Sequence, residues 1–470
     1  LEQARPSVFV AVDGYKYGDK DRDLRDEATT VRDALASLRV SVMLEYLGAG
    51  IPDDSWTAWD AFSDEEGSLT FEPVPFDHPL YILYSSGTTG KSKAIVHGHG
   101  GIMLEHAKAL RLHFDLDGRD RFFWYTTTGW MMWNLCVSGL LVDATVCLYD
   151  GNPSWPSADA LWRFVDDCDV TCAGVGASFL VANQKAGLSP GKSFALRHLV
   201  TLGVTGSPLP ASTAEWVYRE VKPDLLLASF SGGTDVCTGF VGGSPLHPVW
   251  GGEISCRCLG DKVEVFDEEG RSVIDVEGEL VVTAPMPSMP VGLLNDDGDS
   301  RYRATYFERF PGVWAHGDRA TVTSRGTVVI TGRSDGTLNR GGVRMGTAEF
   351  YSVVDEFDEV VDSLVVHLED PDGGPGELWL FVVVKHGVDD AELSPRLASA
   401  LRTRLSPRHV PDRIVTVPSV PRTPTGKKLE VPVKRILNGA DPDSVLTVSS
   451  LADPDSITPF VELARERHNV

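Results

Sequence analysis

The chain has 470 residues, of which 42% are apolar and 23% charged, so it is long enough for two or three domains and is neither disordered nor fibrous in composition. Asp and Glu outnumber Lys and Arg by 67 to 43, and the resulting net charge of −24 argues against a nucleic-acid partner. No apolar run approaches the roughly 20 residues that a membrane span needs, so no membrane partner is expected.

The cysteines and the first residues give further expectations. The seven cysteines are scattered and only Cys256 and Cys258 lie close together, which predicts neither a metal cluster nor a disulfide framework. A reducing cytosol is therefore the expected compartment, and a monomer is the default expectation. The chain opens at Leu1 directly on a strand-like stretch, which predicts a truncated or partial protein.

Strand-like and helix-like stretches alternate through the first half of the chain. The strand-like runs are residues 7–14, 39–46, 144–150, 197–206 and 224–233, and residues 101–114 have a helical pattern. This alternation predicts α/β layers with parallel strands. From about Lys262 onward, residues 262–274, 278–287 and 313–333 predict hairpins with glycine turns and hence a smaller β-rich subdomain.

A domain boundary is predicted near residues 333–336, where a compact α+β pattern begins. Residues 364–370 and 378–387 are strand-like. The helix after them is predicted to start at Ser394 as N-cap, with Pro395 in its first position and with Leu397, Leu401 and Leu405 on one face.

The expected fold class is α/β, with a large N-terminal domain of several subdomains and a small mobile α+β domain after it. The predicted bounds are residues 1–334 for the first domain, 335–440 for the small lid domain, and 441–470 for a weakly patterned extension.

The most informative segment is YILYSSGTTGKSKAIVHGHGG at residues 81–101, in which an apolar strand runs into a loop rich in Gly, Ser and Thr. The glycines allow backbone N–H groups to face an anion, the hydroxyls add donors, and Lys91 or Lys93 adds a positive charge. The residues predicted to bind the phosphates of ATP are Ser85, Ser86, Gly87, Thr88, Thr89, Gly90 and Lys91.

Two other interpretations of this loop carry less weight. A flexible surface loop does not account for the apolar strand that leads into it. The P-loop of nucleoside triphosphatases, G-x-x-x-x-G-K-[ST], matches Gly90, Lys91 and Ser92, but its first glycine falls on Ser85. Because the tight first turn needs that glycine, the P-loop is disfavoured.

The segment SSGTTGKSKAIVHGHGG closely resembles the phosphate-binding loop of the adenylate-forming superfamily, which includes acyl-CoA synthetases, luciferases and peptide-synthetase adenylation domains. Further segments resemble the other motifs of that superfamily in the same order. These are TTTGWMMWN (126–134), TGSPLP (205–210), SGGTD (231–235), HGDRA (316–320), GRSDGTLNRGGVRMGTAE (332–349) and PRTPTGKKLE (421–430). The resemblance implies two half-reactions, in which a carboxylate attacks the α-phosphate of ATP and the thiol of CoA then displaces AMP.

The resemblance assigns Lys427 to catalysis of the adenylation step. Lys427 follows a glycine turn, from which its long side chain can reach the carboxylate and the α-phosphate. The neighbouring Lys428 is the alternative, because adjacent lysines are often a solvated pair. Counting along the motif from Gly426 selects Lys427.

The same resemblance implies contacts to the nucleotide. The implied contacts are Gly206, Ser207 and Pro208 with adenine, Asp318 and Arg333 with the ribose, and Arg344 with the phosphates. Asp335 resembles the hinge residue about which the small domain swings between the half-reactions.

Asp235 stands where most members of the superfamily have a glutamate that binds Mg²⁺. A hard oxygen ligand is retained with one methylene fewer, so Asp235 is the predicted metal ligand and Mg²⁺ the predicted cofactor. Thr234 beside it is a predicted phosphate or hydroxyl contact.

The acid pocket is predicted from one position of the same loop. Acetyl-CoA synthetases carry Trp two positions before the Thr, whereas this chain has Gly232, followed by Gly233. Replacing an indole by hydrogen makes room for a longer acid. Trp130, Met131 and Trp133 are candidate walls, although core packing explains them equally well.

The segments SGGTDVCTGFVGG, TTTGWMMWN and VDGYKYGDKDRD closely resemble acetoacetyl-CoA synthetases, and the resemblance extends over essentially the whole chain. It implies ATP, acetoacetate and CoA as substrates, with Lys16 and Lys20 as candidate contacts to the CoA phosphates. Compared with that family, the chain lacks the portion ahead of SVFVAVDG. The pocket argument alone supports only a short acid larger than acetate.

Other functions stay open at this point. One is a synthetase for another short or branched acid, or one that passes the acid to a carrier protein. A second is an inactive nucleotide-binding fragment. Dependence on free CoA and exchange of pyrophosphate into ATP distinguish these from the leading interpretation.

Overall fold

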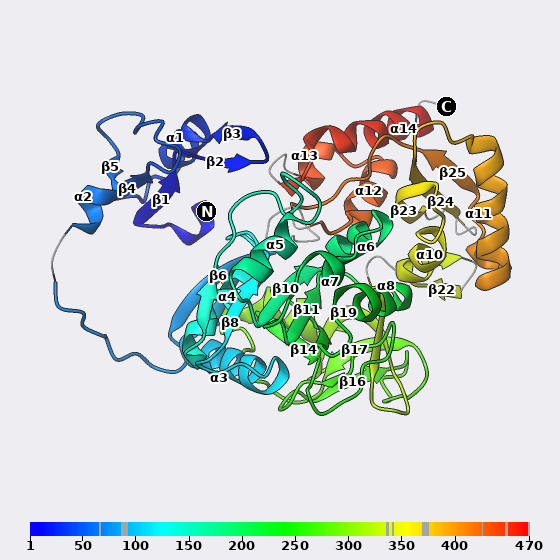
Figure 1. Ribbon diagram of the computed structural model, residues 1–470, viewed down its shortest axis with the longest axis horizontal. Coiled ribbons are helices and arrows are strands. Elements are labelled where there is room, and N and C mark those ends of the chain that lie inside the picture. Colours follow the sequence, from blue (N-terminus) through cyan, green and yellow to red (C-terminus); the bar gives the residue numbers. More distant parts are fainter. Residues whose placement is uncertain are drawn as a thin grey trace.

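The computed structural model describes residues 1–64, 67–85, 93–334, 338–340, 343–368, 376–424, 426–446 and 450–468, without the side chains of residues 333, 339, 340, 343 and 344. Figure 1 shows an N-terminal lobe, a large central part and a C-terminal part beside it. No helix among the described residues has both the length and the apolar character needed to cross a membrane.

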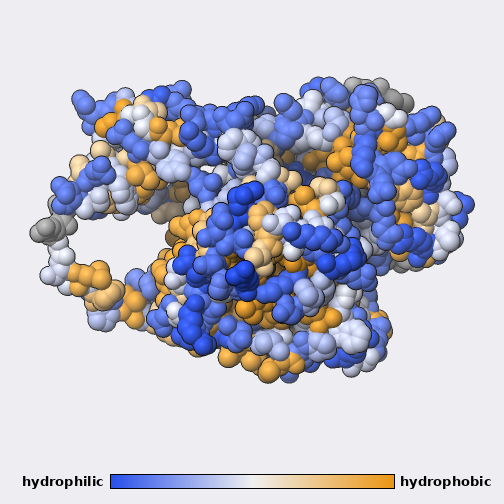
Figure 2. Space-filling model, viewed as in Figure 1, coloured by the Kyte–Doolittle hydropathy of each residue, from blue (hydrophilic) through white to orange (hydrophobic). Residues whose placement is uncertain are grey.

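The N-terminal lobe contains a small parallel sheet in the order β1-β4-β5. Its elements are β1 (Val8–Val12), β2 (Gly14–Tyr17), β3 (Lys20–Asp23), α1 (Arg25–Asp33), β4 (Val40–Leu44), β5 (Thr57–Ala58) and α2 (Trp59–Ser63). A long segment joins the lobe to the central part, and its apolar side chains Leu69 and Phe71 are more than 80% exposed. Figure 2 shows this segment as an arm that carries orange, apolar atoms.

A five-stranded parallel sheet in the order β12-β11-β10-β8-β9 forms the centre. Its strands are β8 (Arg121–Trp124), β9 (Thr145–Cys147), β10 (Cys172–Gly176), β11 (Thr201–Thr205) and β12 (Leu226–Ser229). Alternate side chains point to opposite faces, so Phe123 packs in one core cluster while Phe122 and Trp124 pack in another. Both faces are therefore buried, as the expected α/β layers require.

Helices cover the two faces of this sheet. One cluster includes side chains of α5 (Ala160–Asp167), α6 (Ala177–Lys185) and α8 (Ala211–Trp216), and the other includes those of α3 (His99–Lys108) and α4 (Met131–Val137). The remaining helix in this part is the short α7 (Pro190–Ser193), and π-helical turns at 109–113 and 217–221 continue α3 and α8.

The β-rich part consists of small antiparallel sheets. The first pairs β6 (Pro79–Ser85) with β7 (Lys93–Gly98) and β18 (Gly292–Leu293), and the second pairs β13 (Ser231–Gly233), β14 (Thr238–Gly242) and β15 (Cys256–Arg257). The third contains β16 (Val263–Phe266), β17 (Gly278–Val282), β19 (Trp314–Val322) and β20 (Val328–Arg333), with α9 (Ser300–Phe307) nearby. The hairpins expected after Lys262 are present.

The C-terminal part packs helices on a three-stranded sheet. The strands of this sheet are β23 (Val360–Leu368), β24 (Glu377–Val384) and β25 (Arg413–Thr416), and β21 (Leu338–Arg340) pairs separately with β22 (Val343–Met345). Its helices are α10 (Thr347–Val354), α11 (Asp390–Arg404), α12 (Glu430–Leu437), α13 (Pro442–Val445) and α14 (Thr458–His468).

The predicted start of α11 is wrong. The helix begins at Asp390, where the carboxylate of Asp389 accepts a hydrogen bond from the N–H of Ala391. Asp389 thus caps the helix in place of Ser394, and Pro395 lies inside it. An aspartate is as good an N-cap as a serine, and the sequence offered both.

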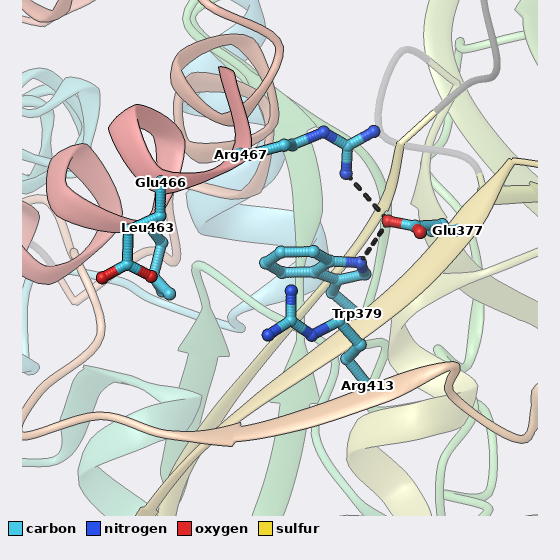
Figure 3. Close-up of a pocket in the computed structure, with 6 residues that line it drawn as sticks. All are labelled: Glu377, Trp379, Arg413, Leu463, Glu466 and Arg467. Carbon is cyan, nitrogen blue, oxygen red and sulfur yellow. Dashed lines mark hydrogen bonds and ion pairs between the residues drawn. The ribbon is translucent and has the colours of Figure 1, made fainter. Parts of the chain in front are cut away.

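Residues 458–468 form a helix, α14, that packs tightly on the sheet, which the weak pattern after Leu437 did not indicate. Phe460 of α14 is fully buried against Phe381 of β24. A pocket beside this contact is lined by Glu377, Trp379, Arg413, Leu463, Glu466 and Arg467 (Figure 3). Glu377 accepts hydrogen bonds from Trp379 and Arg467, both at 2.9 Å, so the polar groups there fasten α14 to the sheet. None of the predicted site residues lines this pocket.

A buried ionic cluster joins α3 to the segment after β15. The ammonium of Lys108 lies 2.6 Å from Oε1 of Glu105 and 2.9 Å from Oδ2 of Asp261, and neither carboxylate side chain is exposed. Burial and the charge of Glu105 raise the pKa of Asp261 to about 7, although Lys108 opposes them. The two buried carboxylates thus share one cation, and Asp261 retains its proton until the pH approaches its raised pKa of about 7.

This cluster predicts a pH-dependent stability. The ordinary pKa of Asp261 is 3.8, so the stability from its bound proton is complete below about pH 4 and is lost as the pH rises to about 7. Asp261→Asn, which is neutral at every pH, is expected to gain roughly 2–3 kcal/mol in free energy of unfolding relative to wild type between pH 5 and pH 8.

Urea unfolding at the two pH values measures this gain. Asp224→Asn is the control, since that carboxylate is exposed and lies 3.9 Å from Lys222. A difference between Asp261→Asn and wild type that does not change with pH would contradict the raised pKa of Asp261.

Candidate active site

Several predicted site residues lie in the loops at the carboxyl ends of the central parallel strands. Strand β11 ends at Thr205 and leads into the predicted adenine loop at 206–208, and β12 leads into the SGGTD segment at 231–235. Gly206 has φ +92°, a conformation that disfavours other residues. Ligands of open α/β sheets bind outside the carboxyl ends of the strands, so the predicted nucleotide loops lie where the fold favours a ligand.

Strands β6 and β7 hold the ends of the predicted phosphate loop. Ser85 pairs with Lys93 across the hairpin, and the predicted residues Ser86 to Lys91 lie outside the described residues. Within the described part of the chain, Oγ of Ser85 is buried without a hydrogen-bond partner. The hairpin therefore presents a polar group and Lys93 at the base of the loop.

Asp235 lies in a charged contact that the sequence did not indicate. Its Oδ1 lies 2.8 Å from Nζ of Lys93 and also accepts a hydrogen bond from the hydroxyl of Tyr306. The Tyr306 ring stacks on Trp314, with centroids 3.7 Å apart. Burial alone would raise the pKa of Asp235, but Lys93, His316 and Tyr306 hold it well below its usual range.

His97 of β7 forms a hydrogen bond with the backbone next to Asp235. Burial lowers the pKa of His97 to about 4, so its imidazole is neutral. Its Nε2 lies 2.9 Å from the carbonyl oxygen of Thr234, which only accepts, so the proton is on Nε2. The main-chain contact of Thr234 thus fixes the loop that carries Asp235.

The surroundings of Asp235 fit a magnesium ion shared with ATP. Such ions are held by one or two carboxylates together with phosphate oxygens and water. Both hydrogen bonds that described residues give to Asp235 end on Oδ1, so Oδ2 is the oxygen that would bind an ion. No group of three His, Cys, Asp or Glu side chains suited to a metal occurs among the described residues, so phosphates and water would complete the coordination.

Asp318 is buried on β19, opposite Arg333 of β20. Its Oδ2 lies 3.6 Å from Nε2 of His316, which is itself almost fully buried. The side chain of Glu279 supports the strand between His316 and Asp318, because its Oε1 accepts a hydrogen bond from the N–H of Gly317 at 3.1 Å. The predicted ribose carboxylate is therefore held on a rigid strand.

Other atoms of the protein lie very close to the two glycines of SGGTD. A Cβ on Gly232 would lie 2.0 Å from the carbonyl oxygen of Thr238, and one on Gly233 would lie 2.9 Å from the ring of His316. Backbone pairing and His316 thus require these glycines independently of any substrate. Their role in the acid pocket stays a prediction.

The large side chains at the start of α4 (Met131–Val137) and just before it differ in burial. Met131 is buried in the core cluster on one face of the sheet, whereas Trp130 and Trp133 are half-buried. The Trp130 ring would lie 3.8 Å from a Cβ on Gly206, so this indole borders the predicted adenine loop.

Lys427 is brought to the strand ends by a tight turn. Gly426 has φ +85°, and a Cβ on it would lie 3.0 Å from Oγ of Ser178, at the start of α6 and just after β10. Lys185 of the same helix donates to the carbonyl oxygen of Val360 at 3.2 Å. The turn that carries the exposed Lys427 therefore rests on the edge of the sheet where the nucleotide loops converge.

Lys428 has a different environment from Lys427. Its Nζ lies 3.5 Å from Oδ1 of Asp362 and 3.4 Å from the centre of the Tyr351 ring, and burial lowers its pKa. Asp362 is also paired with Arg422 at 2.6 Å. Lys428 is therefore part of the internal packing of the C-terminal part, whereas Lys427 is exposed and stays the predicted catalytic lysine.

The predicted CoA contacts Lys16 and Lys20 are exposed, and the side chains of three other predicted residues lie outside the described part of the chain. Lys16 and Lys20 lie on the exposed hairpin β2–β3, where Lys16 pairs with Asp21 at 3.6 Å. The side chains of Arg333 and Arg344, and the whole of Asp335, lie outside the described residues.

Three residues joined to the site had escaped the sequence analysis. Tyr306 contacts Asp235 from a helix distant from it in sequence, and Trp314 stacks on Tyr306 from strand β19. Ser178 lies against the Gly426 turn. Single aromatic residues and a serine at a helix start carry no local motif, so only the three-dimensional contacts identify them.

Comparisons with known proteins agree with this arrangement. The family model "AMP-binding enzyme" matches residues 1–289, and "AMP-binding enzyme C-terminal domain" matches residues 350–427. An acetoacetyl-coenzyme A synthetase of Rhizobium meliloti (strain 1021) is 42% identical over 468 residues, which cover 98% of this chain and 71% of that protein. An acetoacetyl-CoA synthetase of Gallus gallus is 39% identical, covering 94% of this chain and 68% of that protein.

Comparison with solved structures supports the same family. The acetoacetyl-CoA synthetase from Streptomyces lividans superposes with a TM-score of 0.91 at 46% identity, covering 99% of this chain and 71% of that chain. An anthranilate CoA ligase in complex with anthranoyl-AMP has a TM-score of 0.76 at 18% identity over 91% of this chain and 77% of that chain, which shows a shared fold. The expected α/β fold class is confirmed, and the chain belongs to the acetoacetyl-CoA synthetase family of AMP-binding enzymes.

Proposed function

We propose that this chain is an ATP-dependent acid–thiol ligase that forms acetoacetyl-CoA from acetoacetate and CoA and releases AMP and diphosphate. The observation that carries the proposal is the position of Lys427. Its turn rests on Ser178, at the carboxyl edge of the sheet from which the adenine loop and the Asp235 loop also extend.

In the first half-reaction a carboxylate oxygen of acetoacetate attacks the α-phosphorus of ATP, and diphosphate leaves. Two negatively charged groups must approach each other, so the ammonium of Lys427 is placed to neutralise both. Lys93 adds positive charge at the base of the phosphate loop, next to Asp235. A magnesium ion at Asp235 would neutralise phosphate oxygens as diphosphate departs.

Asp318 and residues 206–208 bind the adenosine. A buried carboxylate accepts hydrogen bonds from both ribose hydroxyls, and the loop after β11 contacts the adenine. Fixing the nucleoside at the sheet edge leaves the α-phosphate as the group presented to the acid and to Lys427.

In the second half-reaction the sulfur of CoA attacks the acyl carbon of the adenylate, and AMP leaves with the bonding electrons. This step needs the thiol where Lys427 had been, so the small domain rotates about Asp335. Lys16 and Lys20 extend positive charge from the N-terminal lobe toward the CoA phosphates.

Formation of the thioester by the purified chain tests this function. With ATP, Mg²⁺, acetoacetate and CoA, one AMP is expected for each acetoacetyl-CoA formed. A carrier-protein thiol in place of CoA is expected to give no product. Equal use of a carrier thiol would contradict the assignment of CoA.

A further inference from the structure

His316 occupies a position between the two functional carboxylates of the site. Its ring is 1% exposed, faces Asp318 at 3.6 Å through Nε2, and would contact any side chain placed on Gly233. The ring of Phe240 meets it edge-on, with centroids 4.6 Å apart. His316 therefore has a fixed place and little freedom to turn.

Trp314 determines which nitrogen of this ring carries the proton. The indole Nε1 of Trp314 lies 3.4 Å from Nδ1 of His316 and can only donate. Nδ1 accepts in the neutral ring, and both nitrogens carry protons in the cation, so in either state Nε2 directs a proton at Asp318. Trp314 is in turn held by its stack on Tyr306.

We propose that His316 is a positioning residue, which directs its Nε2–H at Oδ2 of Asp318 and so orients that carboxylate toward the sugar hydroxyls of the nucleotide. A separation of 3.6 Å is longer than a full hydrogen bond, and such contacts tighten when a ligand binds. This inference rests on the proposed role of Asp318 in binding the ribose.

The test compares a nucleotide with and without its sugar hydroxyls. AMP and 2′,3′-dideoxy-AMP are titrated into the purified chain by calorimetry, without metal, so the readout is binding and not turnover. Wild type is expected to bind AMP at least about tenfold more tightly, because the hydroxyls donate to a buried carboxylate. Asp318→Asn is expected to remove this preference.

The variants of His316 separate orientation from packing. His316→Leu keeps an apolar bulk without a donor, and is expected to weaken AMP binding about tenfold while dideoxy-AMP binds as before. His316→Gln, whose amide nitrogen can reach the same oxygen, is expected to restore most of the preference. Trp314→Phe keeps the stack on Tyr306 without the N–H and is expected to reduce the preference about threefold.

Each contrary result has a separate meaning. If His316→Leu weakens both ligands equally, or if it keeps the preference that Asp318→Asn loses, the role of His316 is overturned and that of Asp318 stands. If Asp318→Asn itself keeps the preference, the proposed contact of Asp318 with the ribose fails, and the inference fails with it.

Discussion

Lys427→Gln is expected to slow the adenylation of acetoacetate by about 100-fold or more, because it removes the positive charge proposed to neutralise the acid and the α-phosphate together. Transfer of a preformed acetoacetyl-adenylate to CoA is expected to stay near the wild-type rate, since that step does not use this ammonium. Pyrophosphate exchange measures the first half-reaction, and thioester formation from the synthetic adenylate measures the second.

Two other lysines serve as controls for this variant. Lys385→Gln changes an exposed lysine of the same domain and is expected to leave both half-reactions unchanged. Lys428→Gln removes the buried partner of Asp362 and is expected to destabilise the C-terminal part rather than act on the chemical step alone. Adenylation at the wild-type rate by Lys427→Gln would remove Lys427 from the mechanism.

Asp235→Asn is expected to have the second largest effect. It removes the carboxylate predicted to bind the metal and leaves Lys93 without its partner at 2.8 Å, in a site where both side chains are about one-fifth exposed. Adenylation is expected to fall about 100-fold, and the free energy of unfolding to fall by about 2 kcal/mol.

Metal binding provides a readout apart from activity. The affinity of the ATP complex for Mn²⁺, followed by electron paramagnetic resonance, is expected to fall about tenfold or more in Asp235→Asn. Asp235→Glu restores a carboxylate and is expected to recover part of that affinity. Wild-type affinity for Mn²⁺ in Asp235→Asn would show that the carboxylate is not a ligand.

The parts of the fold that follow from local pattern could be predicted. Buried parallel strands are continuous apolar runs, so the strands that end at Thr205 and Ser229 were identified from composition alone. The start of α11 was not predicted correctly, because Asp389 and Ser394 are both good N-caps and only packing selects one of them. Helix α14 was overlooked because its buried residues, Phe460 and Ala464, are few among polar ones.

Some residues of the candidate site could be predicted from sequence motifs, and others could be found only from three-dimensional contacts. Asp235, Asp318 and Lys427 lie in motifs whose order along the chain made them recognisable. Tyr306 could not be found, since its contact with Asp235 joins residues 71 positions apart. The sequence also gave no reason to choose between Lys427 and Lys428 apart from the motif. Burial of Lys428 against Tyr351 supplies a physical reason.

Acid-dependent exchange of labelled pyrophosphate into ATP, catalysed by the purified chain with Mg²⁺, tests the proposed ligase activity. Acetoacetate, acetate, butyrate and no acid are compared at equal concentration. The expected result is exchange that depends on an acid and is fastest with acetoacetate. Exchange that is fastest with another acid would contradict the substrate, and binding of ATP without exchange for any acid would contradict the ligase activity of this chain.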